Sequence, residues 1–408
     1  MGKLNIFEIS FSNLSGVYFS GDLMQGYVTI ELTESMEMRG IRLKLKGGAK
    51  VLWTESETSS DGDNSTTTTH THSASEKYFS QTILLMGILP KQGNQTVSLP
   101  VGRHTYPFQF QLPTGLPSSF EDSIGHVRYT VKSVIDKPWK FDHKTKRPFT
   151  VISILDLNLQ ADCSQKLQAT KSKTLCCLCC KSRPIEATFV VERKGYVPGE
   201  AIKLYAEIFN GTNRAMSKSY INLTMVKSFH ATTDSKTEYK EVARLTRPSI
   251  QPRQGDAWSG EELVIPPLPP SFLHGCKIID ISYKLQLNVD PSGPALDLEI
   301  PFDIIIGTIP LLSVVQKYPP LPPPPPAWDK MYLWENTPSA PPLEHVYPAP
   351  PASSVPNLPP PSYDECITGR VNIKGSSDEY TRGNLSYCPM YPCYNWGKTA
   401  SGLPEVEK

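Results

Sequence analysis

Two sequence landmarks, each of which occurs twice in the same order, constrain the fold of this chain most strongly. The first is a Tyr-x-x-Gly-acid turn before an alternating strand, read as VYFSGDLMQGYVTIEL around Tyr18 and GYVPGEAIKLYAEIF from Gly195. The second begins at Leu116 as LPSSFEDSIGHVRYTVKS and returns at Leu268 as LPPSFLHGCKIIDISYKLQLNVD. A long pattern that returns once predicts two similar domains in tandem.

The two landmarks lie about 26 residues farther apart in the first copy than in the second. An insertion of about this size is visible between Trp53 and Tyr78, where residues 55–77 read ESETSSDGDNSTTTTHTHSASEK. The segment is polar and of low complexity, so we expect it to add nothing to a hydrophobic core. His70 and His72 within it could bind a metal weakly, but surface histidines without a metal are far commoner, and we expect no metal site.

Most of the first 308 residues read as short strands with period-two alternation, for example YVTIEL, YPFQFQL, VRYTVKSVI and IKLYAEI. This alternation, with turn residues at short intervals, is typical of antiparallel β-sandwiches with one solvated face. We therefore predict an all-β fold of two tandem sandwiches and a disordered tail. The predicted boundaries are an N-terminal sandwich at 1–157 with the insertion at 55–77, a linker and start of the second lobe at 158–183, a C-terminal sandwich at 184–309 and a proline-rich tail at 310–408.

The tail differs sharply in composition from the two sandwiches. Between Pro319 and Pro361, 17 of 43 residues are proline. Such a segment lacks backbone donors and an apolar pattern, so we expect an extended, solvated chain with much polyproline II character. Its function must then lie in short linear motifs.

The sequence LPPPSYDE contains a P-P-x-Y motif formed by Pro360, Pro361 and Tyr363. A polyproline II helix has three residues per turn, and WW domains bind such peptides in grooves lined with aromatic side chains. Because proline fixes its own φ, little conformational entropy is lost on binding. In a proline-rich tail the motif can also arise by chance.

A second motif precedes it by fewer than thirty residues. The sequence TPSAPP contains P-[ST]-A-P, the peptide bound by the ubiquitin-E2-variant domain of ESCRT-I, at Pro338, Ser339, Ala340 and Pro341. Taken alone, these four common residues could equally be a linker. Their position beside the P-P-x-Y motif favours a docking function for both.

A cluster of four cysteines, Cys176, Cys177, Cys179 and Cys180, stands beside Lys181 and Arg183. The first interpretation is a buried strand edge at the junction of the lobes, where reduced cysteines act as small hydrophobic residues. The second is S-palmitoylation, which together with basic residues would supply two membrane signals. Zinc binding ranks last, because a C-x-x-C pair needs a second pair of ligands at a workable spacing.

The global charge does not indicate nucleic-acid binding, since 41 Lys and Arg balance 40 Asp and Glu. Residues 128–183 carry a local excess of Lys and Arg, which favours anionic partners such as phospholipid headgroups or phosphorylated tails. A solvated face plus linker is an equal alternative. We find no G-x-S-x-G or H-E-x-x-H motif and no secretory signal or spanning segment, so we expect a cytoplasmic protein with no catalytic residues and no cofactor.

The order of SGDLMQGYVTIEL, WTES, LPTGLPSSFED, KTLCCLCC, ERKGYVPGE and IPFDIIIGTIPL resembles the α-arrestins, also called arrestin domain-containing proteins. The opening MGKLNIFEIS and the tail are most similar to the member of that family that combines P-S-A-P and P-P-x-Y motifs. The resemblance implies two arrestin-type lobes and adaptor function without an active site. Many α-arrestins carry two P-P-x-Y motifs, whereas this sequence has one strict copy.

The resemblance also implies the partners. They are WW-domain HECT-type ubiquitin ligases, ESCRT-I, and membrane receptors or transporters as cargo, with recruitment of the protein to the plasma membrane and endosomes. The alternative is a retromer-like structural coat subunit with the same fold, which would have no need of the two tail motifs.

Overall fold

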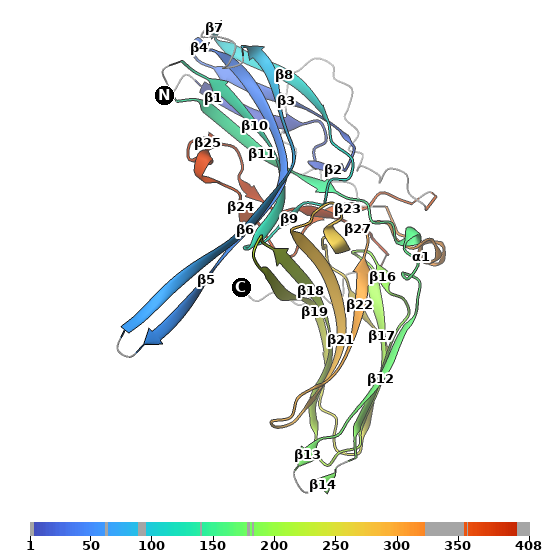
Figure 1. Ribbon diagram of the computed structural model, residues 1–408. Helices are drawn as coiled ribbons and strands as arrows, with labels where there is room; N and C mark the ends of the chain where they lie inside the picture. The colour runs from blue at the N-terminus through green and yellow to red at the C-terminus, as the bar shows by residue number, and fades with distance from the viewer. Residues whose placement is uncertain are drawn as a thin grey trace.

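The computed structural model describes residues 4–61, 64–88, 95–138, 141–177, 180–181, 183–322, 355–356 and 358–397. These residues form two β-sandwich lobes arranged end to end, as the sequence predicts, with the last described segment lying between them (Figure 1).

Each lobe consists of two packed sheets. In the N-terminal lobe, one sheet has the order β1 (Leu4–Phe11), β3 (Leu23–Leu32), β8 (Gly102–Gln111). The other has the order β2 (Val17–Phe19), β11 (His143–Ile152), β10 (Gly125–Asp136), β5 (Gly40–Asp61), β6 (Asn64–Gly87), with β9 (Phe120–Glu121) beside β10. A small separate sheet pairs β4 (Met36–Met38) with β7 (Val97–Leu99).

The C-terminal lobe follows the single turn η1 (Leu157–Leu159). Its first sheet has the order β12 (Leu167–Lys173), β15 (Ile185–Val191), β17 (Ala201–Asn210), β20 (Gly255–Val264). Its second has the order β16 (Gly195–Tyr196), β22 (Leu298–Ile306), β21 (Ile279–Pro291), β18 (Met216–His230), β19 (Ser235–Arg247). The remaining elements are the hairpin β13 (Cys176–Cys177) and β14 (Cys180–Lys181), the turn η2 (Ser271–Leu273) and the helix α1 (Leu312–Lys317).

The second sheets of the two lobes have the same topology. In both, a short first strand runs parallel to its neighbour, and every later pair in the order given above is antiparallel. The internal repeat read from the sequence is therefore a repeat of structure as well.

The repeated Tyr-x-x-Gly-acid motif forms the same turn in each lobe. Gly21 and Gly199 have φ of +92° and +90°, a left-handed conformation that favours glycine because a Cβ would be strained there. The following acids, Asp22 and Glu200, each accept a hydrogen bond from the backbone N–H three residues earlier, at 2.6 and 3.2 Å. The motif thus repeats because a sharp turn with a carboxylate acceptor begins each domain.

The second repeated landmark places a buried tyrosine at equivalent positions. The hydroxyls of Tyr129 and Tyr283 each donate a 2.7 Å hydrogen bond to the carbonyl of a proline upstream, Pro117 and Pro269 respectively. Both rings are buried, and such a tyrosine fixes the corner where a strand enters the sandwich.

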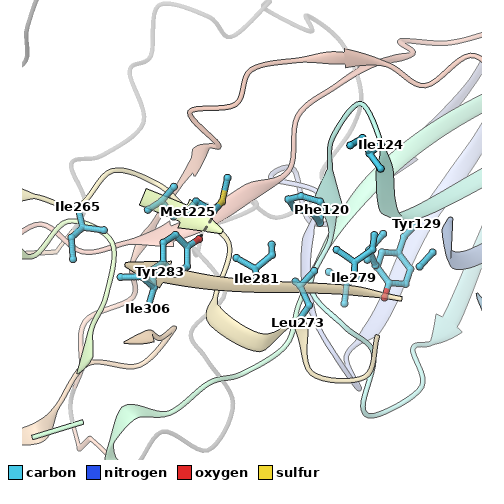
Figure 2. Packing of buried hydrophobic residues seen from close by; sticks show 14 of the residues in the cluster. Phe120, Ile124, Tyr129, Met225, Ile265, Leu273, Ile279, Ile281, Tyr283 and Ile306 are labelled. Carbon is cyan, nitrogen blue, oxygen red and sulfur yellow. Dashed lines mark hydrogen bonds between the residues drawn. The ribbon is translucent and has the colours of Figure 1, made fainter. Parts of the chain in front are cut away.

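The hydrophobic core is continuous from one lobe to the other. Phe120 of the N-terminal lobe and Phe229 of the C-terminal lobe have ring centroids 6.4 Å apart. Figure 2 draws Phe120 together with Leu273 and Ile279 of the C-terminal lobe, and all three residues belong to one cluster of buried apolar side chains. The lobes therefore share buried apolar surface at their junction.

A buried ion pair joins the lobes beside this core. Lys227 Nζ in β18 lies 2.6 Å from Asp122 Oδ2 of the N-terminal lobe and 3.1 Å from Glu238 Oε2 of β19. The side chains of Lys227 and Asp122 are only 7% and 9% exposed.

The insertion at 55–77 extends strands β5 and β6 into a hairpin that projects from the N-terminal lobe (Figure 1). Its described side chains are exposed or half-exposed, although one of them, the half-buried Ala74, packs against the core. The segment is nevertheless regular: hydroxyl pairs such as Thr58 with Thr67 face each other across the strands. Threonine is β-branched and favours an extended backbone, which explains this regularity.

Residues 358–397, which we name the tail segment, differ from the expected disordered tail. They form short strands, β23 (Ser362–Glu365) with β27 (Met390–Cys393) and β24 (Val371–Asn372) with β26 (Ser386–Tyr387), while β25 (Thr381–Arg382) pairs with β11. The physical reason is composition. Proline is sparse after Pro361, and buried tyrosines and cysteines supply apolar contacts that a polyproline segment lacks.

Candidate functional site

Of the two docking motifs predicted from the sequence, one lies within the described residues and the other does not. The P-S-A-P residues 338–341 lie outside the described residues. The P-P-x-Y motif is described, and it lies within the tail segment between the two lobes (Figure 1). Tyr363 occupies β23, where it faces Pro392 of β27.

Tyr363 is buried, with 6% of its surface exposed. It belongs to a cluster whose members come from both the tail segment and the N-terminal lobe: Val17, Phe19, Ile152, Cys366, Cys388 and Tyr391. Burial raises the pKa of its hydroxyl, and the nearby carboxylate of Asp22 adds to the effect. Of the motif prolines, Pro361 is buried and Pro360 is half-buried.

Three further tyrosines hold the tail segment against the lobes. All three are buried, and their hydroxyls donate hydrogen bonds to backbone carbonyls of the lobes: Tyr387 to Phe149 at 3.2 Å, Tyr391 to Ser119 at 2.8 Å and Tyr394 to Thr308 at 2.8 Å. The first two acceptors belong to the N-terminal lobe, and the third follows the last strand of the C-terminal lobe. The tail segment therefore contacts both lobes.

An acidic residue of the tail segment, Asp378, binds two lysines of the N-terminal lobe. Lys132 Nζ lies 2.6 Å from its Oδ1, and Lys146 Nζ lies 2.8 Å from its Oδ2. Burial raises the pKa of this carboxyl, but hydrogen bonds from the two lysines and from the Gly375 N–H outweigh burial and hold the pKa well below its ordinary range. The charged form is thus the one that docks.

Backbone approaches the lobes so closely at two places that only glycine fits. A Cβ on Gly199 would lie 2.1 Å from the carbonyl oxygen of Tyr394, and one on Gly383 would lie 2.3 Å from that of Lys146. Gly199 belongs to the repeated turn of the C-terminal lobe, so this turn also forms part of the surface that receives the tail segment.

Lys132 and Lys146 belong to a larger cationic surface, which we name the basic face. Alternate residues of β10 point away from the core, so His126, Arg128 and Lys132 share one side of the sheet. A hollow of about 380 Å³ on this side is lined by Lys44, Lys46, Lys77, His126, Arg128 and Lys146, among others.

The charges of the basic face act on one another. Burial, together with the charges of Arg128, Lys50 and Lys146, lowers the pKa of His126 to about 3. Burial, followed by the charges of Lys46, Arg42 and Lys132, lowers the pKa of Lys44. Clustered cations of this kind bind carboxylates and phosphates.

The cysteine cluster lies far from this region. The hairpin of β13 and β14, which carries Cys176, Cys177 and Cys180, lies at the end of the C-terminal lobe farthest from the N-terminal lobe (Figure 1). The interpretation that placed these cysteines at the junction of the lobes is therefore wrong. Cys179 lies outside the described residues.

One group of side chains has donor atoms at metal-ligand spacing. Glu55, His72 and Asp234 place one ligand atom each within 4.8 Å of the others and join the root of the projecting hairpin to the C-terminal lobe. His72 also stacks on Trp53 and shares a 3.1 Å hydrogen bond with Thr233. Because both carboxylates are exposed and the histidine already has these contacts, we read the group as a polar contact between the lobes.

Comparison with known families decides the identity of the two lobes. Residues 7–158 match the family model described as Arrestin (or S-antigen), N-terminal domain, and residues 181–311 match Arrestin (or S-antigen), C-terminal domain. This chain belongs to the arrestin family. The predicted class of two tandem arrestin domains is thereby confirmed.

Individual relatives agree with the family match. The arrestin-family chain is 31% identical over 323 residues to Arrestin domain-containing protein 17 of Caenorhabditis elegans, covering 77% of this chain and 72% of the relative. It is 34% identical over 302 residues to human Arrestin domain-containing protein 4, covering 72% and 69%. It is 28% identical over 401 residues to rat Arrestin domain-containing protein 1, covering 98% and 84%.

These relatives confirm the resemblance to arrestin domain-containing proteins, a family of adaptors without enzymatic activity. The specific combination of tail motifs stays a prediction. Within the described part of this arrestin, no helix has the length and apolar character needed to cross a membrane.

The sequence pattern identified Tyr363 but not the tyrosines that hold the tail segment against the lobes. Tyr387, Tyr391 and Tyr394 stand in the stretch SYCPMYPCYNW, where four aromatic side chains occur within eleven residues. Such a density of large apolar side chains, in a region assigned to a solvated tail, was the available signal that this stretch packs on something.

Proposed function

We propose that this arrestin-family protein is an adaptor that links membrane cargo to the ubiquitination and budding machinery. Pro360, Pro361 and Tyr363 bind a WW domain of a HECT-type ubiquitin ligase, and residues 338–341 bind the ubiquitin-E2-variant domain of ESCRT-I. The protein would act from the cytoplasm, with recruitment to the plasma membrane and endosomes. The observation that carries this proposal is a strict P-P-x-Y motif attached to a two-lobed arrestin body.

The basic face supports the cargo side of the proposal. Lys44, Lys46 and Lys77 line a hollow on the N-terminal lobe. Acidic or phosphorylated segments of a receptor or transporter would bind there through charge-assisted hydrogen bonds. The tail motifs also distinguish this adaptor from a retromer-like coat subunit, which would not require them.

Acylation of the cysteine cluster is a further part of the proposal. The hairpin from Cys176 to Lys181 forms the outermost tip of the C-terminal lobe, and Lys181 and Arg183 stand beside the cysteines. A palmitoyl chain beside basic residues would attach that tip to an anionic bilayer. Mass spectrometry of the 171–183 region purified from cells tests this directly.

The decisive experiment uses pulldowns of the full-length protein with isolated WW domains and, separately, with the ubiquitin-E2-variant domain. We expect Tyr363→Ala to lose WW binding and keep ESCRT-I binding, and Pro338→Leu to do the reverse. Tyr347→Ala, a tail tyrosine outside a strict P-P-x-Y, is the matched control and should lose neither. If Tyr363→Ala leaves WW binding intact, the ligase-docking mechanism is wrong.

A further inference from the structure

The residues that a WW domain would contact are already engaged within this chain. A WW domain takes an extended proline segment in its groove and the tyrosine ring in a separate pocket. Here the Tyr363 ring is packed against Val17, Phe19 and Ile152 of the N-terminal lobe. The main chain of β23 is at the same time paired with β27. The Tyr363 ring and the β23 main chain therefore cannot keep these contacts while they are bound to a WW domain.

The contacts that hold the tail segment are spread well beyond the motif itself. Tyr391 is 1% exposed and anchored on Ser119, and Tyr394 is anchored on Thr308. Asp378 binds two lysines fifteen residues after Tyr363. Because these contacts involve both lobes, the motif is held by the folded body as a whole and not by a local turn.

We propose that the tail segment is an intramolecular inhibitor of ligase docking: residues 358–397 pack on both lobes and thereby exclude WW domains from Tyr363. Docking of the tail segment and docking of the ligase are mutually exclusive. This inference rests on the proposed function, since it assumes that the P-P-x-Y motif is the ligase port. The sequence has one strict motif, so closing it leaves no second strict copy available.

The inference predicts the size of the effect in terms of populations. If the released state makes up a fraction f of the molecules, the apparent Kd of a WW domain for the full chain equals its Kd for the free motif divided by f. A contact network of this extent should keep f below about one tenth, so full-length protein should bind at least ~10-fold more weakly than the isolated motif.

The test compares the affinity of one isolated WW domain for a synthetic peptide of residues 355–369 and for full-length protein. Two substitutions weaken the dock and leave the motif intact: Asp378→Asn, which removes the charge bound by Lys132 and Lys146, and Tyr391→Ala, which removes a buried anchor. Both lie in the tail segment, so the cores of the lobes are unchanged. The matched control is Glu379→Gln, which removes the charge of the neighbouring, exposed carboxylate.

We expect the peptide to bind at least ~10-fold more tightly than the wild-type chain. The affinities of Asp378→Asn and Tyr391→Ala should approach that of the peptide, and the affinity of Glu379→Gln should equal that of the wild type. Equal affinities for peptide and full chain, with no effect of either substitution, would overturn the inference.

Hydrogen exchange separates failure of the inference from failure of the proposed function. A peptide without affinity for WW domains would refute the ligase port, whatever the tail does. In the same samples, the amides of residues 363–365 should be protected in the wild-type chain and should exchange faster in Asp378→Asn. Fast exchange in the wild type would refute the docked tail itself.

Discussion

Removal of the buried charge on Lys227 should measure how firmly the two lobes hold each other. Its ammonium group lies 2.6 Å from Asp122 of the other lobe and 3.1 Å from Glu238. Lys227 and Asp122 are almost fully buried, whereas the side chain of Glu238 is 34% exposed. We therefore expect the pair between Lys227 and Asp122 to dominate the response.

The magnitudes follow from what each substitution leaves behind. Breaking a buried ion pair by removing one partner costs ~3–5 kcal/mol of unfolding free energy. Lys227→Met leaves the Asp122 carboxylate buried, so we expect a loss of about 3 kcal/mol. Asp122→Ala leaves Lys227 with Glu238, so we expect a smaller loss, about 2 kcal/mol.

The double variant Asp122→Ala/Lys227→Met removes both buried charges together. Replacing a whole buried pair by apolar side chains is often close to neutral. Because the loop also loses the hydrogen bond from the Ile124 N–H to Asp122, we expect a loss of about 2 kcal/mol. The two single losses would then exceed the double loss by about 3 kcal/mol.

Urea denaturation followed by circular dichroism and tryptophan fluorescence supplies the four free energies. Lys166→Met, at an exposed lysine, is the control and should change stability by less than ~0.5 kcal/mol. Additive losses in the double variant would refute the reasoning, because they would show that Lys227 and Asp122 do not share one interaction.

Three further predictions concern the repeat, the tail segment and the hairpin. Tyr129→Phe and Tyr283→Phe should each cost ~1–3 kcal/mol in urea denaturation, since each leaves a buried proline carbonyl without its donor; a change in only one of them would contradict the equivalence of the lobes. The docked form depresses the pKa of Asp378, so its contribution to docking should be complete at neutral pH and decline below about pH 4, the ordinary Asp pKa. Hydrogen exchange at residues 363–365 measures this loss of docking. The Asp378→Asn variant should lack the pH dependence that arises from the Asp378 carboxyl. Replacing residues 57–68 by a two-residue Asn-Gly turn should leave the melting temperature almost unchanged, because the described side chains removed are exposed.

The parts of the fold that local sequence determines were predictable. The turns at Gly21 and Gly199 need only a left-handed glycine and a nearby carboxylate, so their spacing reveals them wherever they occur. The alternation of strands such as β10 and β18 follows from burial of one face, and this too is written in consecutive residues.

The tail segment was not predictable in the same way, because its partners are distant in sequence. Burial of Tyr363 requires Phe19 and Ile152, which lie far apart in the sequence and come together on neighbouring strands only when the N-terminal lobe has folded. The attraction of Asp378 requires Lys132 and Lys146 to stand side by side on neighbouring strands. From composition alone we expected these residues to be solvent-exposed. The tail's own sequence does not reveal the surface of the lobes on which they pack.

The repeated glycine turn has different consequences in the two lobes. A Cβ on Gly21 would meet only the side chain of Thr114 at 3.3 Å, whereas one on Gly199 would meet the backbone of Tyr394 at 2.1 Å. Alanine at Gly21 would therefore strain one turn, while alanine at Gly199 would both strain its turn and displace the backbone of Tyr394 in the tail segment. The two copies of the turn thus meet the tail segment differently: the first contributes the side chain of Phe19 to the cluster around Tyr363, and the second contacts the backbone of Tyr394.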